Sequence, residues 1–103
     1  MLKFDLELYT WVADGSQRRA ILKALTGSMT PTMVRKESLQ YNPKISLTHA
    51  SKILKSFEER GLTVCLNKGV KRSKIYELTE LGSDMRNVLL LKVKIGTFNA
   101  CNE

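Results

Sequence analysis

Residues 46–82 read SLTHASKILKSFEERGL (46–62), TVCLN (63–67), KGVKRSK (68–74) and IYELTELG (75–82). The first segment begins with a serine, carries apolar residues at helical spacing and stops at a glycine, which are typical signals of a capped helix. Two short apolar runs around a basic turn predict a hairpin with strands over 62–67 and 74–78. Thr79 is placed to cap another helix. Helix, hairpin and helix would therefore form one rigid unit with positive charge on its helix face and hairpin tip.

Within the helix predicted over about 46–60, Ser46 is the expected N-cap. The residues expected to face the core recur every three or four positions: Leu47, Ala50, Leu54 and Phe57. The opposite face is polar and basic.

Two further helices are predicted upstream. The first begins at a capping box formed by Asp14 and Gln17, or at Ser16 as the alternative cap, and ends at Gly27. The second, over about 32–39, has Thr30 as its cap and Pro31 at its first position. Its probable core side chains are Met33, Val34 and Leu39. An Asn-Pro loop over 40–44 then leads to the third helix.

These elements divide the chain into four parts. Residues 1–13 form an N-terminal apolar segment for packing or dimerisation, whose pattern fits either a strand or a helix. Residues 14–79 form the core of three helices and a hairpin, and residues 80–95 a C-terminal helix that covers the core and dimerises. Residues 96–103 are expected to be a loose tail.

The composition fits one small globular domain with a polyanionic partner. The chain has 103 residues, of which 43% are hydrophobic, and this length supports a core without cross-links. Seventeen Lys and Arg against ten Asp and Glu give a net charge of +7. A basic excess of this size favours nucleic acid as a partner without proving it.

The predicted fold class is mainly α with a small antiparallel β-wing, the order of a winged helix-turn-helix. A closer resemblance is carried by GSQRRAIL (15–22), SKIL (51–54), ERGL (59–62), CLN (65–67) and YELTELG (76–82). In these residues the chain resembles the small winged-helix transcriptional regulators of archaea, similar to the MarR and ArsR groups. The resemblance covers about residues 16–91. It implies a DNA-binding regulator, usually a homodimer, with the third helix in the major groove.

Two features depart from that family pattern. Arg35 stands where the family usually carries a small residue packed against the recognition helix. The loop over 39–44 is longer than the tight turn of a simple helix-turn-helix.

A DNA-binding site is predicted on the third helix, the wing and the start of the first helix. Hydroxyl, imidazole and ammonium groups near a helix N-terminus can reach base edges and phosphates. A cationic turn can follow the phosphate backbone or enter the minor groove. The wing turn shows no acid nearby in sequence. The expected contact residues are Ser46, Thr48, His49, Ser51, Lys52, Lys55, Lys68, Lys71, Arg72, Lys74, Arg18 and Arg19.

A dimer interface is predicted on a surface to which the N-terminal segment and the last helix both contribute, because a small domain seldom leaves such apolar faces in water. The alternative is that the two segments cover each other within one chain. The expected interface residues are Leu6, Tyr9, Trp11, Met85, Val88, Leu89 and Leu91.

Other classes of site are not indicated. No phosphate-binding glycine loop, catalytic serine or cysteine signature or carboxylate pair is apparent, so an enzyme is not expected. No cofactor is expected. No metal is expected either, since the one histidine and the two cysteines, Cys65 and Cys101, are not clustered. Cys65 is expected to be a packed thiol. With no signal peptide or membrane-length apolar run, we expect a cytoplasmic protein and no membrane partner.

The sequence therefore predicts a homodimeric regulator that binds double-stranded DNA sequence-specifically, with the recognition helix about 46–60 in the major groove and the wing 67–74 on the backbone or in the minor groove. Two alternatives remain: a winged-helix module for protein interaction, and a non-specific chromatin- or RNA-binding protein.

Overall fold

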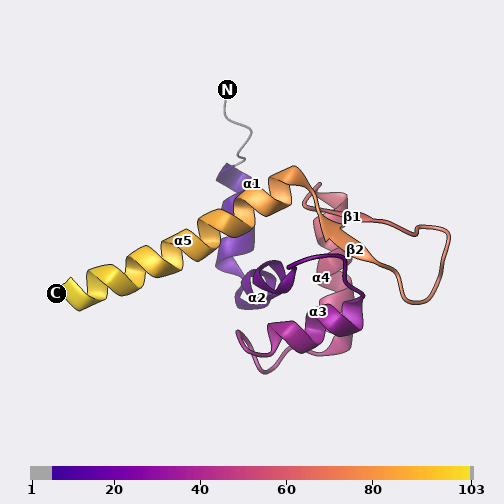
Figure 1. Ribbon diagram of the computed structural model, residues 1–103, viewed down its shortest axis with the longest axis horizontal. Coiled ribbons are helices and arrows are strands. Elements are labelled where there is room, and N and C mark those ends of the chain that lie inside the picture. The colour runs from indigo at the N-terminus through magenta and orange to yellow at the C-terminus, as the bar shows by residue number, and fades with distance from the viewer. Residues whose placement is uncertain (1–5, 103) are drawn as a thin grey trace.

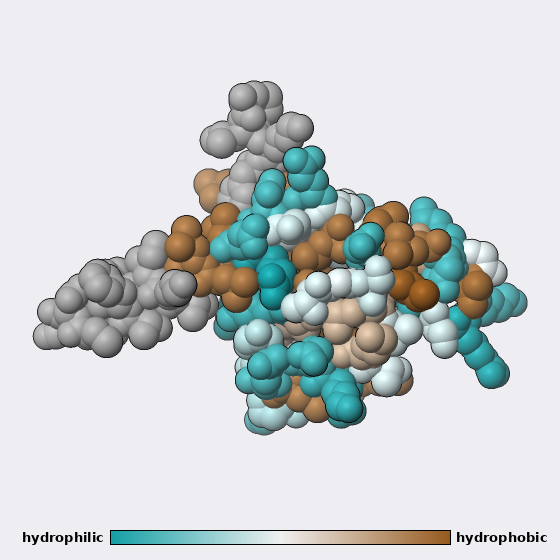
Figure 2. Space-filling view, viewed as in Figure 1, coloured by the Kyte–Doolittle hydropathy of each residue, from teal (hydrophilic) through white to brown (hydrophobic). Residues whose placement is uncertain are grey.

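The computed structural model describes the backbone of residues 6–102 and the side chains of residues 6–91. In chain order the elements are α1 (Leu6–Asp14), α2 (Ser16–Ala24), α3 (Pro31–Ser38), α4 (Leu47–Glu59), β1 (Thr63–Cys65), β2 (Tyr76–Leu78) and α5 (Glu80–Asn102). This arrangement confirms the predicted fold class. In Figure 1 the loop between β1 and β2 projects from one side of the molecule, and α5 leads away on the other. Figure 2 shows hydrophilic side chains on the side of the projecting loop, with some hydrophobic ones among them.

Three of the predicted helix caps are present. The backbone N–H of Met33 donates to Thr30 Oγ1 over 3.3 Å, and that of His49 donates to Ser46 Oγ over 3.1 Å. The N–H of Gly82 donates to Thr79 Oγ1 over 3.1 Å. Each bond satisfies a donor that the first turn of a helix leaves without a partner, so the starts of α3, α4 and α5 are fixed locally.

The first predicted helix begins where expected, at Ser16, but the predicted cap and the predicted end were wrong. The N-cap of α2 is Gly15, and no side chain caps it, so neither the Asp14–Gln17 box nor Ser16 has that role. Two arginines of α2 bind carbonyl oxygens in the last turn of α1, which directly precedes α2. Arg18 Nε donates to the carbonyl oxygen of Trp11 over 2.7 Å, and Arg19 Nη1 donates to that of Ala13. The helix ends at Ala24, before Gly27.

The structure also defines the secondary structure near the two ends of the chain. Residues 6–14 form a helix, which decides between the two readings of that segment; residues 1–5 lie outside the described part. At the other end α5 continues beyond residue 95 to Asn102, so the predicted loose tail is helical as far as the description extends. Gly96 costs a helix interior about 1 kcal/mol but does not end it.

The sheet has two antiparallel strands, in which Thr63 pairs with Leu78 and Cys65 with Tyr76. Both strands are shorter than predicted, and the wing loop between them is correspondingly longer. Met29, between α2 and α3, adds an isolated bridge to Tyr76 through backbone bonds of 2.9 and 2.8 Å. This bridge ties the helical part of the fold to the base of the wing.

The core lies where α1, α2, α4, β1 and the first turns of α5 meet, with Val34 of α3 beside them. Ala50, Leu54 and Phe57 of α4 are fully buried there. Two residues predicted for the core are exposed instead: Met33 by 48% and Leu47 by 46%. Leu47 lies one turn before the buried stripe of α4, where the helix faces the start of α3 and the wing, so its side chain has no core to enter.

The predicted dimer interface needs a similar correction. Tyr9, Met85 and Leu89 are buried within the protomer and are part of its own core. Trp11 and Val88 are half-buried against that core. Of the set, Leu6 and Leu91 remain well exposed, by 70% and 56%.

Candidate nucleic-acid interface

The outer surface of α4 presents polar side chains to solvent. Thr48, His49 and Lys52 are exposed on the side opposite the core. Ser51 and Lys55 are also exposed and follow Leu47 at four-residue spacing, so these three form a neighbouring line on the helix. Ser46 is half-buried because its hydroxyl caps the helix.

The wing loop is held at its base by one side chain that sequence reasoning missed. Asn67 Oδ1 accepts the backbone N–H of Ile75 over 2.7 Å, and Asn67 Nδ2 donates to the carbonyl oxygen of Ser73 over 3.1 Å. Beside these bonds, Leu66 N–H donates to the Ile75 carbonyl over 2.8 Å. Ser73 has a positive φ of 56°, which turns the chain sharply before β2. Asn67 thereby fixes where the loop's cations are presented.

We expect Asn67→Ala to loosen the wing while leaving the fold intact. The N–H of Ile75 and the carbonyl of Ser73 lose their partner, which costs about 1 kcal/mol of stability. Hydrogen exchange should show the Ile75 amide exchanging at least several-fold faster. Asn87→Ala, at an exposed position of α5, is the matched control. Unchanged protection of Ile75 would contradict this role for Asn67.

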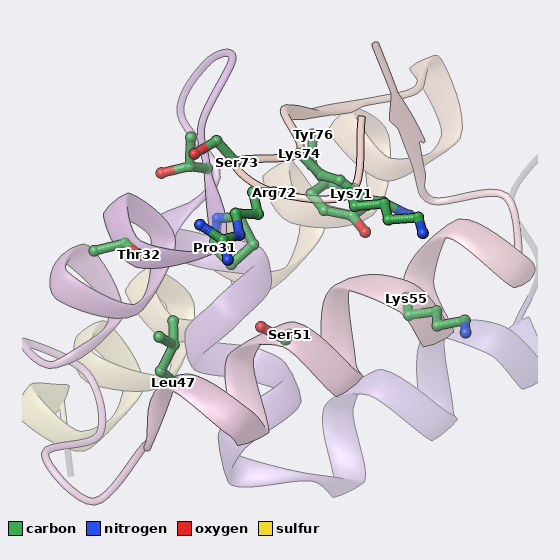
Figure 3. A pocket seen from close by; sticks show the side chains of 11 residues that line it. Pro31, Thr32, Leu47, Ser51, Lys55, Lys71, Arg72, Ser73, Lys74 and Tyr76 are labelled. Carbon is green, nitrogen blue, oxygen red and sulfur yellow. The ribbon is translucent and has the colours of Figure 1, made fainter. Parts of the chain in front are cut away.

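The wing, α4 and the start of α3 line an open cavity of about 430 Å³ (Figure 3). Four of the predicted contact cations line it: Lys55 from α4, and Lys71, Arg72 and Lys74 from the wing. The remaining lining residues are Thr30, Pro31, Thr32, Leu47, Ser51, Ser73 and Tyr76. The lining contains no carboxylate, so its positive charge is not neutralised from within the cavity.

Tyr76 adds a neutral polar group to this lining. Burial, followed by the Glu58 carboxylate and Cys65, raises the pKa of Tyr76 above its ordinary value. Its hydroxyl therefore stays protonated at neutral pH and can donate a hydrogen bond.

Lys68 differs from the other wing cations. Its Nζ lies 3.8 Å from Glu58 Oε2, so the expectation of a wing with no acid nearby was wrong for this residue. Lys68 does not line the cavity. The pair is largely exposed on the lysine side and contributes little stability.

Arg18 and Arg19 are not brought to the cavity. Besides its bond to α1, Arg18 lies with Cζ 4.7 Å from the ring centroid of Trp11, and Arg60 Cζ lies 4.0 Å from the same ring. Trp11 also meets Phe57 edge-on at 5.9 Å between ring centroids. These cations therefore pack at the junction of α1, α2 and α4.

The two departures from the family pattern have structural explanations. Arg35 is exposed, and its Nε donates to the carbonyl oxygen of Ile45 over 3.0 Å, linking α3 to the residue before the α4 cap. The longer loop is bonded within itself: Asn42 N–H donates to the Ser38 carbonyl over 2.9 Å, and Lys44 N–H to Asn42 Oδ1 over 3.0 Å. The loop thus positions α4 without a tight turn.

Two other kinds of site were searched for. Within the described residues, no three or more His, Cys, Asp or Glu side chains gather closely enough to hold a metal ion. None of the helices, as far as they are described, is long and apolar enough to cross a membrane.

Comparison with known proteins identifies the architecture. No protein-family model matches the sequence, and no curated protein matches it. Two solved structures are similar over most of the chain. The MarR family transcriptional regulator SPO1453 from Silicibacter pomeroyi DSS-3 has a TM-score of 0.67 at 15% identity, covering 91% of this chain and 67% of that one. The type III plasmid segregation protein TubR has a TM-score of 0.67 at 19% identity, covering 89% of this chain and 91% of that one. The chain has the winged-helix fold.

In this winged helix, α4 is the helix that leads into the β1–β2 hairpin, and the loop 66–75 is the wing. The cavity between them is the concave side of the winged helix. Figure 3 shows Arg72 of the wing beside Pro31, whereas Lys55 of α4 extends away from Ser51.

Proposed function

We propose that this winged-helix protein is a transcriptional regulator that binds double-stranded DNA sequence-specifically. The observation that carries the proposal is the convergence of Lys55, Lys71, Arg72 and Lys74 on one cavity with no carboxylate in its lining. Cations gathered in this way repel one another, and a polyphosphate partner relieves the repulsion.

In this proposal α4 lies in the major groove, which is wide enough to admit a helix. The exposed Thr48, His49, Ser51 and Lys52 face base edges and nearby phosphates. The wing follows the backbone, where Arg72 contacts a phosphate as Lys71 and Lys74 do. Arg18 and Arg19 are left out of the contact surface because their guanidinium groups are bonded to α1.

We infer that the protein acts as a homodimer. Leu6 and Leu91 are large apolar side chains that one protomer leaves in water, and a second copy would cover them. Two-fold symmetry would place the two copies of α4 about 34 Å apart, one turn of duplex. Sedimentation equilibrium measures this directly: a dimer has twice the mass of the 11.7 kDa chain. A monomer at micromolar concentration would contradict this inference.

A salt titration of duplex binding tests the proposed function. Each phosphate contact contributes roughly −0.9 to the slope of log affinity against log salt concentration. Four contacts per protomer predict a slope of about −3.6 per protomer. Fluorescence anisotropy on duplexes selected from a random pool measures it. Absence of binding, or an affinity that does not change with salt concentration, would favour a protein-interaction module instead. Equal affinity for all duplexes would favour a non-specific chromatin-binding protein.

Plasmid segregation is a second candidate, favoured by one observation. The similarity to TubR extends over nearly the full length of both chains. The same DNA-binding surface would serve this role, so the two candidates differ in which DNA is bound. Bound fragments located upstream of genes would favour regulation, whereas fragments whose deletion causes plasmid loss would favour segregation.

A further inference from the structure

Leu47 is an exposed apolar side chain in a basic surface. It is the first residue of α4, it is 46% exposed, and it lines the cavity together with Ser51 and Lys55. In Figure 3 it extends from the start of α4 toward Pro31 and Thr32 of α3. A leucine left in water at this point forgoes the free energy that burial would supply.

The surroundings of Leu47 define what can cover it. Lys55, Lys71, Arg72 and Lys74 line the same cavity, so an occupant that neutralises them must be anionic. The occupant must also offer an apolar group to the first turn of the helix. DNA meets both conditions, because its backbone is anionic and the thymine 5-methyl is an apolar group on the major-groove edge.

The other exposed side chains of α4 offer little discrimination between bases, so an apolar contact by Leu47 would matter more for sequence specificity. Along the described outer face of α4, no Arg, Asn or Gln is set for a bidentate bond to a purine. The exposed side chains beside Leu47 are Thr48, His49, Ser51, Lys52, Lys55 and, at the far end of the helix, Glu59. Hydroxyl and ammonium groups discriminate between bases less sharply than bidentate pairs do. Leu47 is the large apolar side chain among them.

We propose that Leu47 determines sequence specificity by packing against the 5-methyl group of a thymine in the major groove. This inference rests on the proposed DNA binding and adds the chemical group that is read. The N-terminal residues of a recognition helix are the ones that reach base edges, and Leu47 is the first of them.

The experiment removes that methyl group alone. A preferred duplex is selected from a random pool with the full chain, and each thymine in turn is replaced by deoxyuridine, which keeps the pairing with adenine. In each half-site, one thymine should respond: replacing it removes the buried methyl and should weaken binding of the wild-type protein roughly fourfold. In Leu47→Ala the same replacement should have no effect, while binding to the thymine duplex is itself weaker.

Met33→Ala is the matched control. Met33 is 48% exposed, as Leu47 is, but does not line the cavity. This variant should keep the fourfold discrimination between thymine and deoxyuridine. Thermal melting of both variants checks that the fold is unchanged, as expected for exposed side chains.

The outcomes separate this inference from the proposed function. Salt-dependent binding with no sensitivity to any thymine replacement, a selected site without thymine, or discrimination that persists in Leu47→Ala would overturn the role of Leu47 and leave DNA binding intact. Failure to bind any duplex would overturn both.

Discussion

Replacing Lys71 and Arg72 together by alanine should weaken binding to every duplex by roughly thirtyfold per protomer, since each protomer loses two charge–phosphate contacts of about 1 kcal/mol each. Both side chains line the cavity from the wing, and both are exposed. Because phosphate contacts carry no sequence information, the ranking of duplexes should not change. The salt slope should become shallower by roughly 1.8 per protomer.

The measurement is fluorescence anisotropy at several salt concentrations, with preferred and random duplexes in parallel. The control is Lys92→Ala with Lys94→Ala, which removes the same charge from the C-terminal half of α5, the part of the helix that leads away from the wing (Figure 1). The control should retain nearly full affinity. Equal losses in the two double variants would mean that net charge, and not the wing, drives binding.

Gly82→Ala is expected to destabilise the fold by about 3 kcal/mol, the upper range for overpacking. A Cβ at this position would overlap the carbonyl oxygen of Leu62 and lie 3.0 Å from Leu78 Cδ2. That carbonyl cannot move aside easily, because it accepts the backbone N–H of Thr79 over 2.9 Å. Thr79 in turn donates its hydroxyl to the Gly61 carbonyl over 2.6 Å. The substitution therefore strains the junction between the sheet and α5.

Thermal unfolding should report this change as a fall in Tm of about 15 °C. Gly27→Ala is the matched control, since a Cβ there meets nothing within 4 Å and should leave Tm nearly unchanged. If Gly82→Ala melted like the control, the close approach of α5 to Leu62 would not be a feature of the protein in solution.

The features that sequence predicted well are the ones decided by neighbouring residues. Three helices are capped by the side chains of Thr30, Ser46 and Thr79, each of which accepts the backbone N–H of the residue three positions later. At the other end of α4, Gly61 has a φ of 83°, which favours glycine. Such contacts depend on a few adjacent positions, so composition and spacing are enough to find them.

The features that sequence missed depend on residues distant in the chain. Leu47 fits the apolar period of α4, but its side chain lines the cavity beside the start of α3 and is 46% exposed. Met85 and Leu89 were assigned to a dimer interface, yet the core of the same protomer takes them. Asn67 in the wing gave no signal, because its two partners, Ser73 and Ile75, are brought beside it only by the fold of the loop.

Trp11, against which Arg18 and Arg60 pack, gives the chain an intrinsic fluorescent probe. Trp11 is the single tryptophan, so all indole emission comes from one place. It reports on the junction of three helices and does not line the cavity proposed for DNA. Its fluorescence can therefore follow denaturation in the same cuvette in which duplex is added, with no dye attached and little quenching by bases.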